Sequence, residues 1–434
     1  MIERYTTPAM LAIWSREAKT QTWLDVELAI CKGYAREGVI PAADMEAILA
    51  HSSFTIDRCD ELELETRHDL MAFVRCVSEN ITMKGGFNAE TSPSRWVHFG
   101  VTSYDVIDTA LGIMMRDSVA ILEESLMALQ AEILRLWKEE GHHPCIGRTH
   151  GIHAEVISFG HKCEGWFEEI DRSLARLDYA REEIAVGKIS GAVGIHAHVD
   201  RDLEASICED LGLRADPSST QIISRDRHAH VMNTLAVLAG SLERIATELR
   251  NLQRTEILEV QEEFAKGQTG SSAMPHKRNP WNSETVCGLA RVVRGNAHAM
   301  NESIMTWHER DLANSSLERI VLPDTFLLVD FMVHRVTRVL KGLVVMPDNM
   351  LRNLRLMGDL VFSEHVMVAL IRSGMSRELA YKCAQRNAAK TWEGEDFRTS
   401  VSNDPDVVLR LSKEEIDEIF SMEHHLRNAP VPSA

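Results

Sequence analysis

The chain has 434 residues, of which 44% are hydrophobic and 26% are charged. These values are ordinary for a soluble globular protein, and at roughly 100–200 residues per domain they predict two or three domains. The 47 basic and 65 acidic residues give a formal charge of −18, which argues against a broad nucleic-acid or anionic-membrane surface. A few arginines gathered in one cleft could still bind a small anion.

The N-terminal sequence, the longest apolar run and the cysteines indicate the cellular compartment. The N-terminus, MIERYTTPAM, lacks the apolar core of a signal peptide, and the apolar run FLLVDFMV is interrupted by Asp330 before it could span a bilayer. The eight cysteines are scattered without a Cys-x-x-Cys pair, which favours buried, reduced thiols over a disulfide framework or a structural zinc site. We therefore expect a cytoplasmic protein.

Helical periodicity dominates the chain. The stretch KGGFNAETSPSRW, residues 84–96, breaks a first helical segment, and VVMPDNM, residues 344–350, breaks a second. Between them, apolar residues recur in steps of three and four, and residues 326–343 are apolar on more than one face. The clearest stripes are Val119, Leu122, Leu126, Leu129, Ile133 and Leu136, and then Leu238, Leu242, Ile245, Leu249 and Leu252. The sequence predicts an all-α fold with helical domains at residues 1–100, 101–345 and 346–434, the central one a bundle of long helices.

Five polar stretches interrupt this pattern. Four combine histidine with arginine, serine or threonine and are each followed by a helical pattern, so they could present hydrogen-bond donors at positive helix ends, where anions are favoured. The fifth, residues 267–284, is a polar loop with two glycines and two prolines that frame Lys277 and Arg278. In chain order the stretches read ETRHDL, WVHFGVTSYD, IGRTHGIHAE, GQTGSSAMPHKRNPWNSE and WHERDLANSSLER.

Several other kinds of site have weaker support. A metal could use His150, His153 and Glu155, or the pair His142 and His143, but no further ligand completes either set. The sequence has no Gly-x-Ser-x-Gly elbow of a hydrolase and no glycine-rich nucleotide loop. The residues alone therefore indicate an anionic ligand and proton transfer, and they leave the substrate open.

A resemblance to a known protein family narrows the choice of substrate and reaction. TGSSAMPHKRNP resembles the signature loop of the fumarase/aspartase superfamily, whose pattern is Gly-Ser-Ser-x-Met-Pro-x-Lys-x-Asn-Pro. Further stretches, in order from Met1 to at least Pro323, resemble the adenylosuccinate lyases of the shorter bacterial type. These are MIERYTTPAM, ETRHDLMAF, GRTHGIHAE, STQIISRDRH and WHERDLANSSLERIVLPD.

The resemblance implies a lyase that cleaves a carbon–nitrogen bond and releases fumarate. Such a reaction needs a base for the carbon-bound proton, donors for a carboxylate that becomes doubly charged, and an acid for the departing nitrogen. By resemblance, Ser271 is the base and His150 is the acid. Glu284 orients the His150 imidazole, Lys277 and Asn279 face the succinyl carboxylates, and His68 lies near the reacting end in a supporting role.

The resemblance also implies a nucleotide pocket in which arginine forks pair with phosphate oxygens. Its phosphate and ribose end comprises Arg4, Tyr5, Arg310, Ser315 and Arg319. The remaining substrate contacts are Arg67, Asp69, His98, Thr102, Ser103, Thr149, Gln221, Ser272 and Met274. No metal or cofactor is implied. The expected assembly is a homotetramer in which three subunits contribute to each site, and the Ser271 loop is expected to close over the substrate as a lid.

Two positions depart from the family pattern: Val156 stands where a proline is frequent, and Tyr104 stands where a small residue is common. Both could shift the edge of the pocket, and neither is a proposed catalytic group. Two alternatives remain. The chain could be another lyase of the same fold, such as an argininosuccinate lyase or a related cycloisomerase, although the set of phosphate-binding arginines disfavours it. It could also be a non-catalytic structural protein, although the residues proposed as base and acid are both present.

Overall fold

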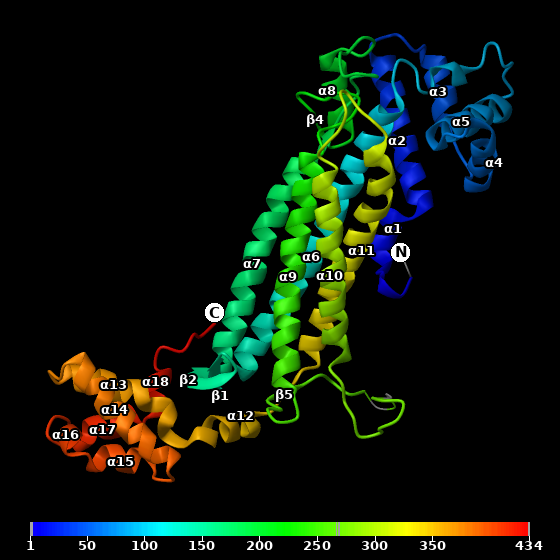
Figure 1. Ribbon diagram of the computed structural model, residues 1–434. Coiled ribbons are helices and arrows are strands. Elements are labelled where there is room, and N and C mark those ends of the chain that lie inside the picture. The colour runs from blue at the N-terminus through cyan, green and yellow to red at the C-terminus, as the bar shows by residue number, and fades with distance from the viewer. Residues whose placement is uncertain (1–2, 266, 268–269, 433–434) are drawn as a thin grey trace. The chain divides into compact units, whose positions relative to one another are not determined.

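The computed structural model describes residues 3–265, 267 and 270–432. The fold is all-α in character, as the sequence predicts, and a bundle of long helices dominates Figure 1. They are α6 (Ser103–Glu140), α7 (Phe159–Ile184), α9 (Asp226–Leu252), α10 (Trp281–Glu302) and α11 (Ala313–Lys341). The residues group into two compact units, unit 1 (1–127, 172–242 and 287–334) and unit 2 (128–171, 243–286 and 335–434). The three successive domains remain a prediction.

Unit 1 contains the N-terminal helices and part of each long helix. The predicted break at residues 84–96 is present, because α5 ends at Gly85 and Gly86 caps it with a φ of 65°. A short parallel pair, β3 (Val186–Gly187) with β4 (Arg214–Ala215), also lies here. The other elements are η1 (Glu3–Tyr5), α1 (Pro8–Trp14), α2 (Arg16–Arg36), α3 (Ala42–His51), α4 (Ile56–Thr66), α5 (Asp69–Gly85), η2 (Pro93–Trp96) and α8 (Arg201–Asp210).

The predicted apolar stripes form the core of the bundle. Every stripe residue of α6 and α9 has at most 2% of its surface exposed, and residues 326–333 of α11 are buried almost all round. Burial of such side chains stabilises the folded state by roughly 1.5–3 kcal/mol each. Polar pairs also join neighbouring helices within unit 1, for example Ser125 with Asp330 at 3.0 Å and Asn296 with Thr325 at 3.0 Å.

Unit 2 contains the other ends of the long helices and one β-hairpin, β1 (Pro144–Thr149) with β2 (Ile152–Ser158). The sequence analysis was wrong here, because it expected IGRTHGIHAE to lead into a helix end. His150 and Gly151 have φ values of 54° and 77°, the left-handed pair that a two-residue hairpin turn requires. The histidine and glycine therefore indicated a turn between strands.

The C-terminal helices pack around their own apolar cluster within unit 2. This cluster includes Phe362, Val366, Phe397 and Phe420, and it also takes in Ile146 of β1, which fixes the base of the hairpin. The predicted break at 344–350 is present as β6 (Val344–Val345), which pairs antiparallel with β5 (Val260–Gln261). The helices are α12 (Pro347–Leu354), η3 (Arg355–Phe362), α13 (Ser363–Arg372), α14 (Arg377–Trp392), α15 (Phe397–Asn403), α16 (Pro405–Val408), α17 (Lys413–Ile419) and α18 (Met422–Leu426).

Two general properties follow from the described residues. None of their helices has the length and apolar character that a membrane crossing requires. All eight cysteines are buried as free thiols, which agrees with the sequence analysis. Burial raises the pKa of Cys145 and Cys163 to about 12, so both remain protonated at neutral pH.

Candidate active site

The signature loop in unit 2 folds onto its own backbone. The Ser271 Oγ accepts a hydrogen bond from the Met274 N–H at 3.1 Å and a second from a neighbouring N–H at 3.3 Å. The Asn279 amide donates to the Gly270 carbonyl oxygen at 3.0 Å. A Cβ at position 270 would lie 2.0 Å from the Lys277 carbonyl oxygen, so only glycine permits this closure. Two N–H groups directed at one hydroxyl oxygen favour negative charge on that oxygen.

A cavity of about 1060 Å³ opens beside this loop. Arg250 of α9 and Arg254, which follows α9, line it and add positive charge suited to an anion. The predicted residues that line it are Met274, Lys277, Asn279 and Glu284. Its lining, as far as the structure describes it, does not include Ser271, Ser272, Thr149 or His150. Gln268 and Thr269, at the start of the motif, lie outside the described residues.

A buried carboxylate that the sequence analysis missed anchors the end of the loop. Glu262 accepts hydrogen bonds from the backbone N–H groups of Asn282 and Ser283, at 3.3 and 2.9 Å, and from their side chains at 2.7 and 2.6 Å. A carboxylate is favoured at this position because the first N–H groups of a helix lack partners within it. Glu262 thereby fixes the start of α10, where Glu284 lies in the first turn.

His150 lies at the exposed tip of the β1–β2 hairpin, with Thr149 beside it. At the base of the hairpin, Arg148 pairs through both guanidinium nitrogens with the fully buried Glu259, at 2.5 and 3.2 Å. The described residues show no hydrogen bond between Glu284 and His150, so the predicted orienting contact is not made within one chain. The Arg148–Glu259 pair thus fixes the base of the hairpin, while the His150 side chain at its tip is exposed to solvent.

Unit 1 brings together another group of predicted residues where α4 meets α5. Arg67 ends α4 with a φ of 52°, and His68 caps α5 by accepting the Met71 N–H at 3.4 Å. Asp69 pairs with Arg319 of α11 at 2.7 Å, and the Arg319 Nε donates to the Ser315 hydroxyl at 3.3 Å. Burial opposes ionisation of Asp69, but the charge of Arg319 outweighs it and lowers the Asp69 pKa.

Arg310 is held between an aromatic ring and an amide. Its guanidinium carbon lies 3.6 Å from the centre of the Tyr104 ring, and its Nη1 donates to the Gln221 side-chain oxygen at 2.9 Å. The Gln221 amide in turn donates to the Ala192 carbonyl oxygen at 3.0 Å. Tyr104 is only 4% exposed. It was noted in the sequence as a departure from the family pattern, and the structure shows that it is the surface on which Arg310 rests.

His98 is paired with a buried carboxylate. The Glu27 side chain accepts the His98 backbone N–H at 2.9 Å and contacts the His98 Nδ1 at 2.7 Å. Burial opposes the charged imidazolium, but the hydrogen bond and the charge of Glu27 outweigh it and raise the His98 pKa. His98 has a φ of 61°, an uncommon left-handed conformation that this pairing helps to stabilise. Glu27, on α2, is a further residue that the sequence analysis missed.

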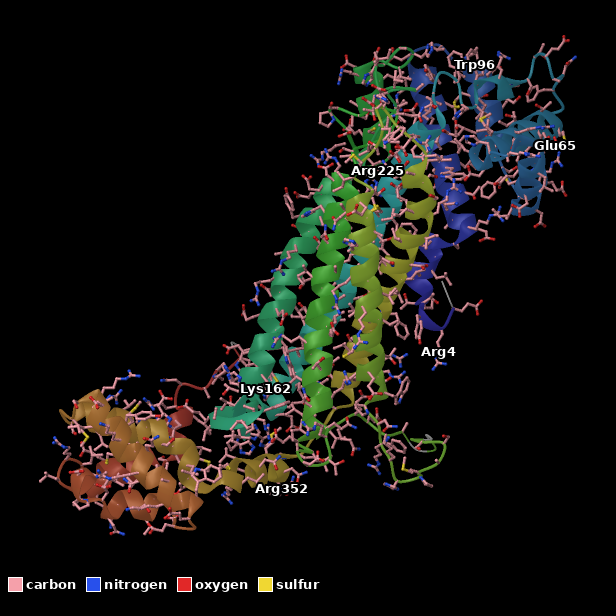
Figure 2. The ribbon with its side chains drawn as sticks, viewed as in Figure 1. Arg4, Glu65, Trp96, Lys162, Arg225 and Arg352 are labelled. Carbon is pink, nitrogen blue, oxygen red and sulfur yellow. The ribbon has the colours of Figure 1, made fainter. Side chains whose placement is uncertain are left out.

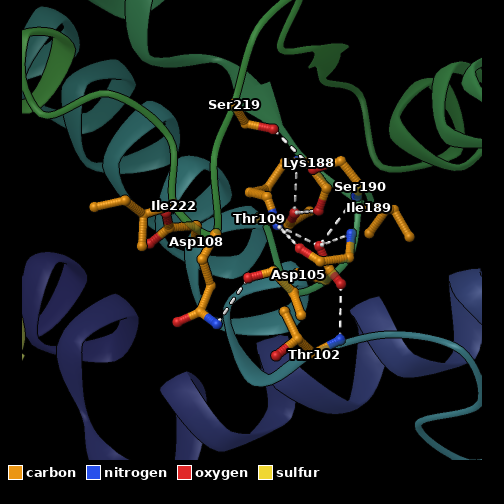
Figure 3. A network of polar contacts seen from close by, with 12 residues as sticks. Thr102, Asp105, Asp108, Thr109, Lys188, Ile189, Ser190, Ser219 and Ile222 are labelled. Atoms are coloured by element: carbon orange, nitrogen blue, oxygen red, sulfur yellow. Dashed lines mark hydrogen bonds and ion pairs between the residues drawn. The ribbon is translucent and has the colours of Figure 1, made fainter. Parts of the chain in front are cut away.

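A buried polar network supports the start of α6, where Thr102 and Ser103 lie (Figure 3). The Asp105 carboxylate accepts the Thr102 N–H at 2.7 Å and the Ser190 N–H at 3.1 Å, and it also pairs with the fully buried Lys188. Every residue that Figure 3 labels belongs to unit 1. The network ties the helix start to the loop that follows β3.

One guanidinium links two long helices of unit 1. Arg225, labelled in Figure 2, is fully buried and pairs with Asp108 of α6 at 2.7 and 2.8 Å, and with Glu318 of α11 at 2.8 and 3.0 Å. Two bidentate pairs on one guanidinium fix the spacing of α6 and α11, and these helices carry Tyr104 and Ser315 respectively.

The predicted N-terminal contacts lie in η1. Tyr5 packs edge-on against Phe331 of α11, with ring centres 5.3 Å apart, and the Arg4 side chain extends from the same turn (Figure 2). The predicted site residues therefore divide between the units. Unit 2 holds Thr149, His150, Ser271, Ser272, Met274, Lys277, Asn279 and Glu284. Unit 1 holds Arg4, Tyr5, Arg67, His68, Asp69, His98, Thr102, Ser103, Gln221, Arg310, Ser315 and Arg319.

Comparison with known proteins decides the family. The family description "Lyase" matches residues 3–295, and "Adenylosuccinate lyase C-terminus" matches residues 359–431. The chain is 47% identical over 430 residues to an adenylosuccinate lyase of Synechocystis sp., covering 99% of this chain and 98% of that protein. It is 45% identical over 429 residues to one of Bacillus subtilis, covering 99% and 97%. The chain belongs to the adenylosuccinate lyase family.

The family assignment confirms the resemblance that the motifs indicated, and it extends it to the C-terminal helices, which the motifs did not reach. Among solved structures, a 3-carboxy-cis,cis-muconate lactonizing enzyme from Pseudomonas putida has the same fold, with a TM-score of 0.87 and 28% identity over 97% of this chain and 94% of that one. The fold therefore supports more than one chemistry, and the assignment to this family rests on the higher identity over the whole chain.

The three carboxylates that the sequence analysis missed, Glu27, Glu259 and Glu262, could hardly be recognised from the sequence. Glu262 stands shortly before a polar loop that leads into a helix, and a carboxylate in that position could have been predicted as a partner for the helix start. Glu27 and Glu259 are single acidic residues within or beside apolar segments. Their partners, His98 and Arg148, are more than 70 positions away in the chain, so spacing alone could not identify the pairs.

Proposed function

We propose that the chain cleaves adenylosuccinate to AMP and fumarate. The observation that carries the proposal is the 47% identity to an adenylosuccinate lyase over nearly the whole of both chains, together with an intact signature loop. We further propose that it cleaves succinyl-aminoimidazole carboxamide ribotide in the same way, and that it works in the cytoplasm in purine nucleotide biosynthesis. Both reactions need an acid, a base and charge stabilisation, and neither needs a metal or a cofactor.

Ser271 is proposed to take the proton from the carbon next to the reacting carboxylate. Serine is a weak base, because its hydroxyl ionises only at high pH. The two backbone N–H groups that point at the Ser271 Oγ, and the Lys277 ammonium in the same loop, would stabilise the alkoxide. Lys277 and Asn279 would then hold the carboxylate as it acquires its second charge.

His150 is proposed to protonate the departing nitrogen, and Glu284 to favour the charged imidazole. His150 and Glu284 are not hydrogen-bonded within one chain, and His150 is exposed. We therefore propose that a homotetramer unites the two groups of site residues, with three subunits contributing to each site. His68 would support the reacting end.

The nucleotide end is proposed to bind through the unit 1 residues. Arg4, Arg310 and Arg319 would hold the phosphate, with Tyr5 and Ser315. Arg310 and Arg319 already have fixed partners, Tyr104 and Asp69 respectively, which limits the side-chain entropy lost on binding. The remaining contacts would come from Arg67, Asp69, His98, Thr102, Ser103, Thr149, Gln221, Ser272 and Met274.

The Ser271 loop is proposed to act as a lid that closes over the substrate and excludes water while the dianion exists. Limited proteolysis tests this proposal, because AMP with fumarate should protect the segment around residues 267–280. A cleavage rate there that is unchanged by saturating product would contradict gating.

Fumarate release on mixing the purified protein with adenylosuccinate is the direct test of the function. Argininosuccinate serves as the parallel substrate, because an argininosuccinate lyase or another member of the same fold would prefer a ligand without phosphate. Turnover of argininosuccinate alone would replace the proposal with that alternative. A protein that folds and assembles yet releases no fumarate from either substrate would be a structural member of the family.

A further inference from the structure

A largely apolar cavity of about 230 Å³, partly open to solvent, lies within unit 1, among α1, α2, α6 and α11. Its walls are largely aromatic and aliphatic, and they include Trp14, Trp23, Tyr104, Leu111 and Met114. The Trp14 indole N–H is already bonded to Ser118 at 2.9 Å, so Trp14 offers the cavity a ring face and no free donor. An apolar cavity of about 150 Å³ is enough to hold benzene in another protein. This cavity therefore has room for one six-membered ring with a small substituent.

One end of the cavity is cationic. Arg16, Lys19 and Arg319 line it there. Arg16 pairs with Asp60 on the exposed side, and Arg319 pairs with Asp69 at 2.7 Å. The side chains of Arg16 and Arg319 are about half exposed, at 49% and 51%, so this end also gives access from solvent.

Lys19 differs from the two arginines, because its ammonium lies over the Trp23 ring at 4.9 Å. Within the described part of the chain, no carboxylate oxygen lies at ion-pair distance from it. Burial lowers the Lys19 pKa, and the Arg319 charge lowers it further, while Asp69 acts in the opposite direction. A half-buried cation beside a second cation is unfavourable unless an anion joins them.

The acidic residue in the cavity wall does not serve as a partner for Lys19. Glu318 lines the cavity, but both of its oxygens accept hydrogen bonds from the buried Arg225, at 2.8 and 3.0 Å. Lys19 and Arg319 also line a second cavity of about 120 Å³ together with Asp69, so Asp69 faces Arg319 from that side. The larger cavity thus combines ring-sized apolar walls with one cation that lacks a partner.

We propose that this cavity is a binding site for a small aromatic carboxylate, with its ring between Trp14, Tyr104 and Leu111 and its carboxylate on the Lys19 ammonium. One unpaired positive charge selects a monoanion, and the aromatic walls select a flat ring. The cavity shares Ser315 and Arg319 with the proposed phosphate end, so in this respect the inference rests on the proposed function. It is tested by direct binding, without turnover.

Benzoate is the probe, and binding is measured by isothermal titration calorimetry on the full chain. Benzoate should bind saturably to the wild-type protein, whereas benzyl alcohol, which has the same ring without the charge, should bind at least about tenfold more weakly, as expected for loss of one charge-assisted contact. Lys19→Met should weaken benzoate binding to a similar degree, and Lys19→Arg should restore most of it. Lys32→Met, an exposed lysine of the same helix, is the matched control.

A second variant tests the ring end. Leu111→Phe should fill the cavity and abolish benzoate binding, while the far-ultraviolet circular dichroism remains unchanged. The proposal is overturned if wild-type protein shows no saturable benzoate binding, if Lys19→Met binds benzoate as well as Lys32→Met does, or if Leu111→Phe leaves the affinity unchanged. Because the readout is direct benzoate binding, the outcome is independent of whether the protein releases fumarate from adenylosuccinate.

Discussion

The two units treat their candidate residues in opposite ways. In unit 1 the proposed nucleotide-binding side chains already have partners, such as Asp69 for Arg319, Glu27 for His98, and Tyr104 with Gln221 for Arg310. In the described part of unit 2, the proposed reacting groups form hydrogen bonds only within their own loop or form none. Ser271 contacts its own backbone, and His150 lies at an open hairpin tip.

This difference matches the demands of the two tasks. A phosphate group carries its charge throughout the reaction, so fixed cations that are already oriented bind it with little entropic loss. The reacting carboxylate gains charge only in the transition state, and groups that meet it must be brought together when the substrate arrives. In unit 2 the fixed contacts are therefore those of Glu262 and Glu259, which hold the start of α10 and the base of the hairpin. The reacting groups themselves have no such fixed partners among the described residues.

Removing a reacting group should produce the largest effect. Ser271→Ala and His150→Ala should each lower kcat by about 10²–10⁴-fold, because each removes one proton transfer, while the far-ultraviolet circular dichroism and the melting temperature stay unchanged. Fumarate release under saturating adenylosuccinate measures kcat. His161→Ala, an exposed histidine near the hairpin, is the control and should retain full activity. Near-normal turnover in either variant would remove that residue from its role.

Mixing the two inactive variants sharpens the comparison of the units. If His150 and Ser271 of different subunits meet in one site, a mixture that has exchanged subunits should regain part of the wild-type rate, because some sites then contain both intact groups. The expected regain is measured after a cycle of mild denaturation and refolding. A mixture that stays as inactive as its components would argue that each site uses one chain.

The second largest effect should come from the buried ion pairs of unit 1. Arg225→Met leaves the carboxylates of Asp108 and Glu318 buried without their cation, which typically destabilises a protein by about 3–5 kcal/mol. Urea unfolding followed by circular dichroism measures the loss. Arg36→Met, which removes an ion pair with Asp210 whose two side chains are 43% and 40% exposed, is the control, with an expected loss of about 1 kcal/mol or less. Equal losses in the two variants would mean that the buried network does not stabilise unit 1.

The fold was largely predictable, because helix periodicity and glycine or proline breaks are local signals. The stripe from Val119 to Leu136 and the breaks at 84–96 and 344–350 are where the sequence places them. The β1–β2 hairpin was not predicted, because its strands lack clear alternation and its turn reads equally well as a helix start. The division into units was not predictable either, since each unit combines segments from three parts of the chain.

The site was predictable only where a motif carried it. Ser271, Lys277 and Asn279 came from a fixed spacing in one loop. Glu262 and Glu27 act through partners that folding brings near, and their sequence neighbours give no such indication. Tyr104 was noticed because it departs from the family pattern, but its contact with Arg310 depends on α6 and a loop more than 200 positions later.

A smaller effect is expected at Tyr104, the ring on which Arg310 rests. Tyr104→Leu should raise KM for adenylosuccinate by about 3–30-fold, in line with a partly desolvated cation–π contact of about 1–2 kcal/mol, because Arg310 loses its orientation. The kcat should change little, since the ring does not contact the reacting atoms. Tyr179→Leu, an exposed tyrosine of α7, is the control. A fall in kcat at constant KM would assign Tyr104 to the reacting end instead.

The smallest effect concerns pH and the His98–Glu27 pair. Glu27 raises the His98 pKa in the folded state, so the pair stabilises the fold fully below the unfolded histidine pKa of about 6.5. That contribution is lost as pH rises through the raised folded value. Glu27→Gln should therefore lower the free energy of unfolding more at about pH 6 than at about pH 9. Urea unfolding at both pH values measures the difference. The first lies about half a unit below the unfolded histidine pKa, and the second lies well above it. Glu37→Gln, an exposed glutamate at the end of the same helix, should show no such difference. If Glu27→Gln costs the same at both pH values, the imidazole does not titrate against Glu27, and the carboxylate acts only as the acceptor of the His98 backbone N–H. That result would leave unit 1 preorganised by hydrogen bonds alone at this position.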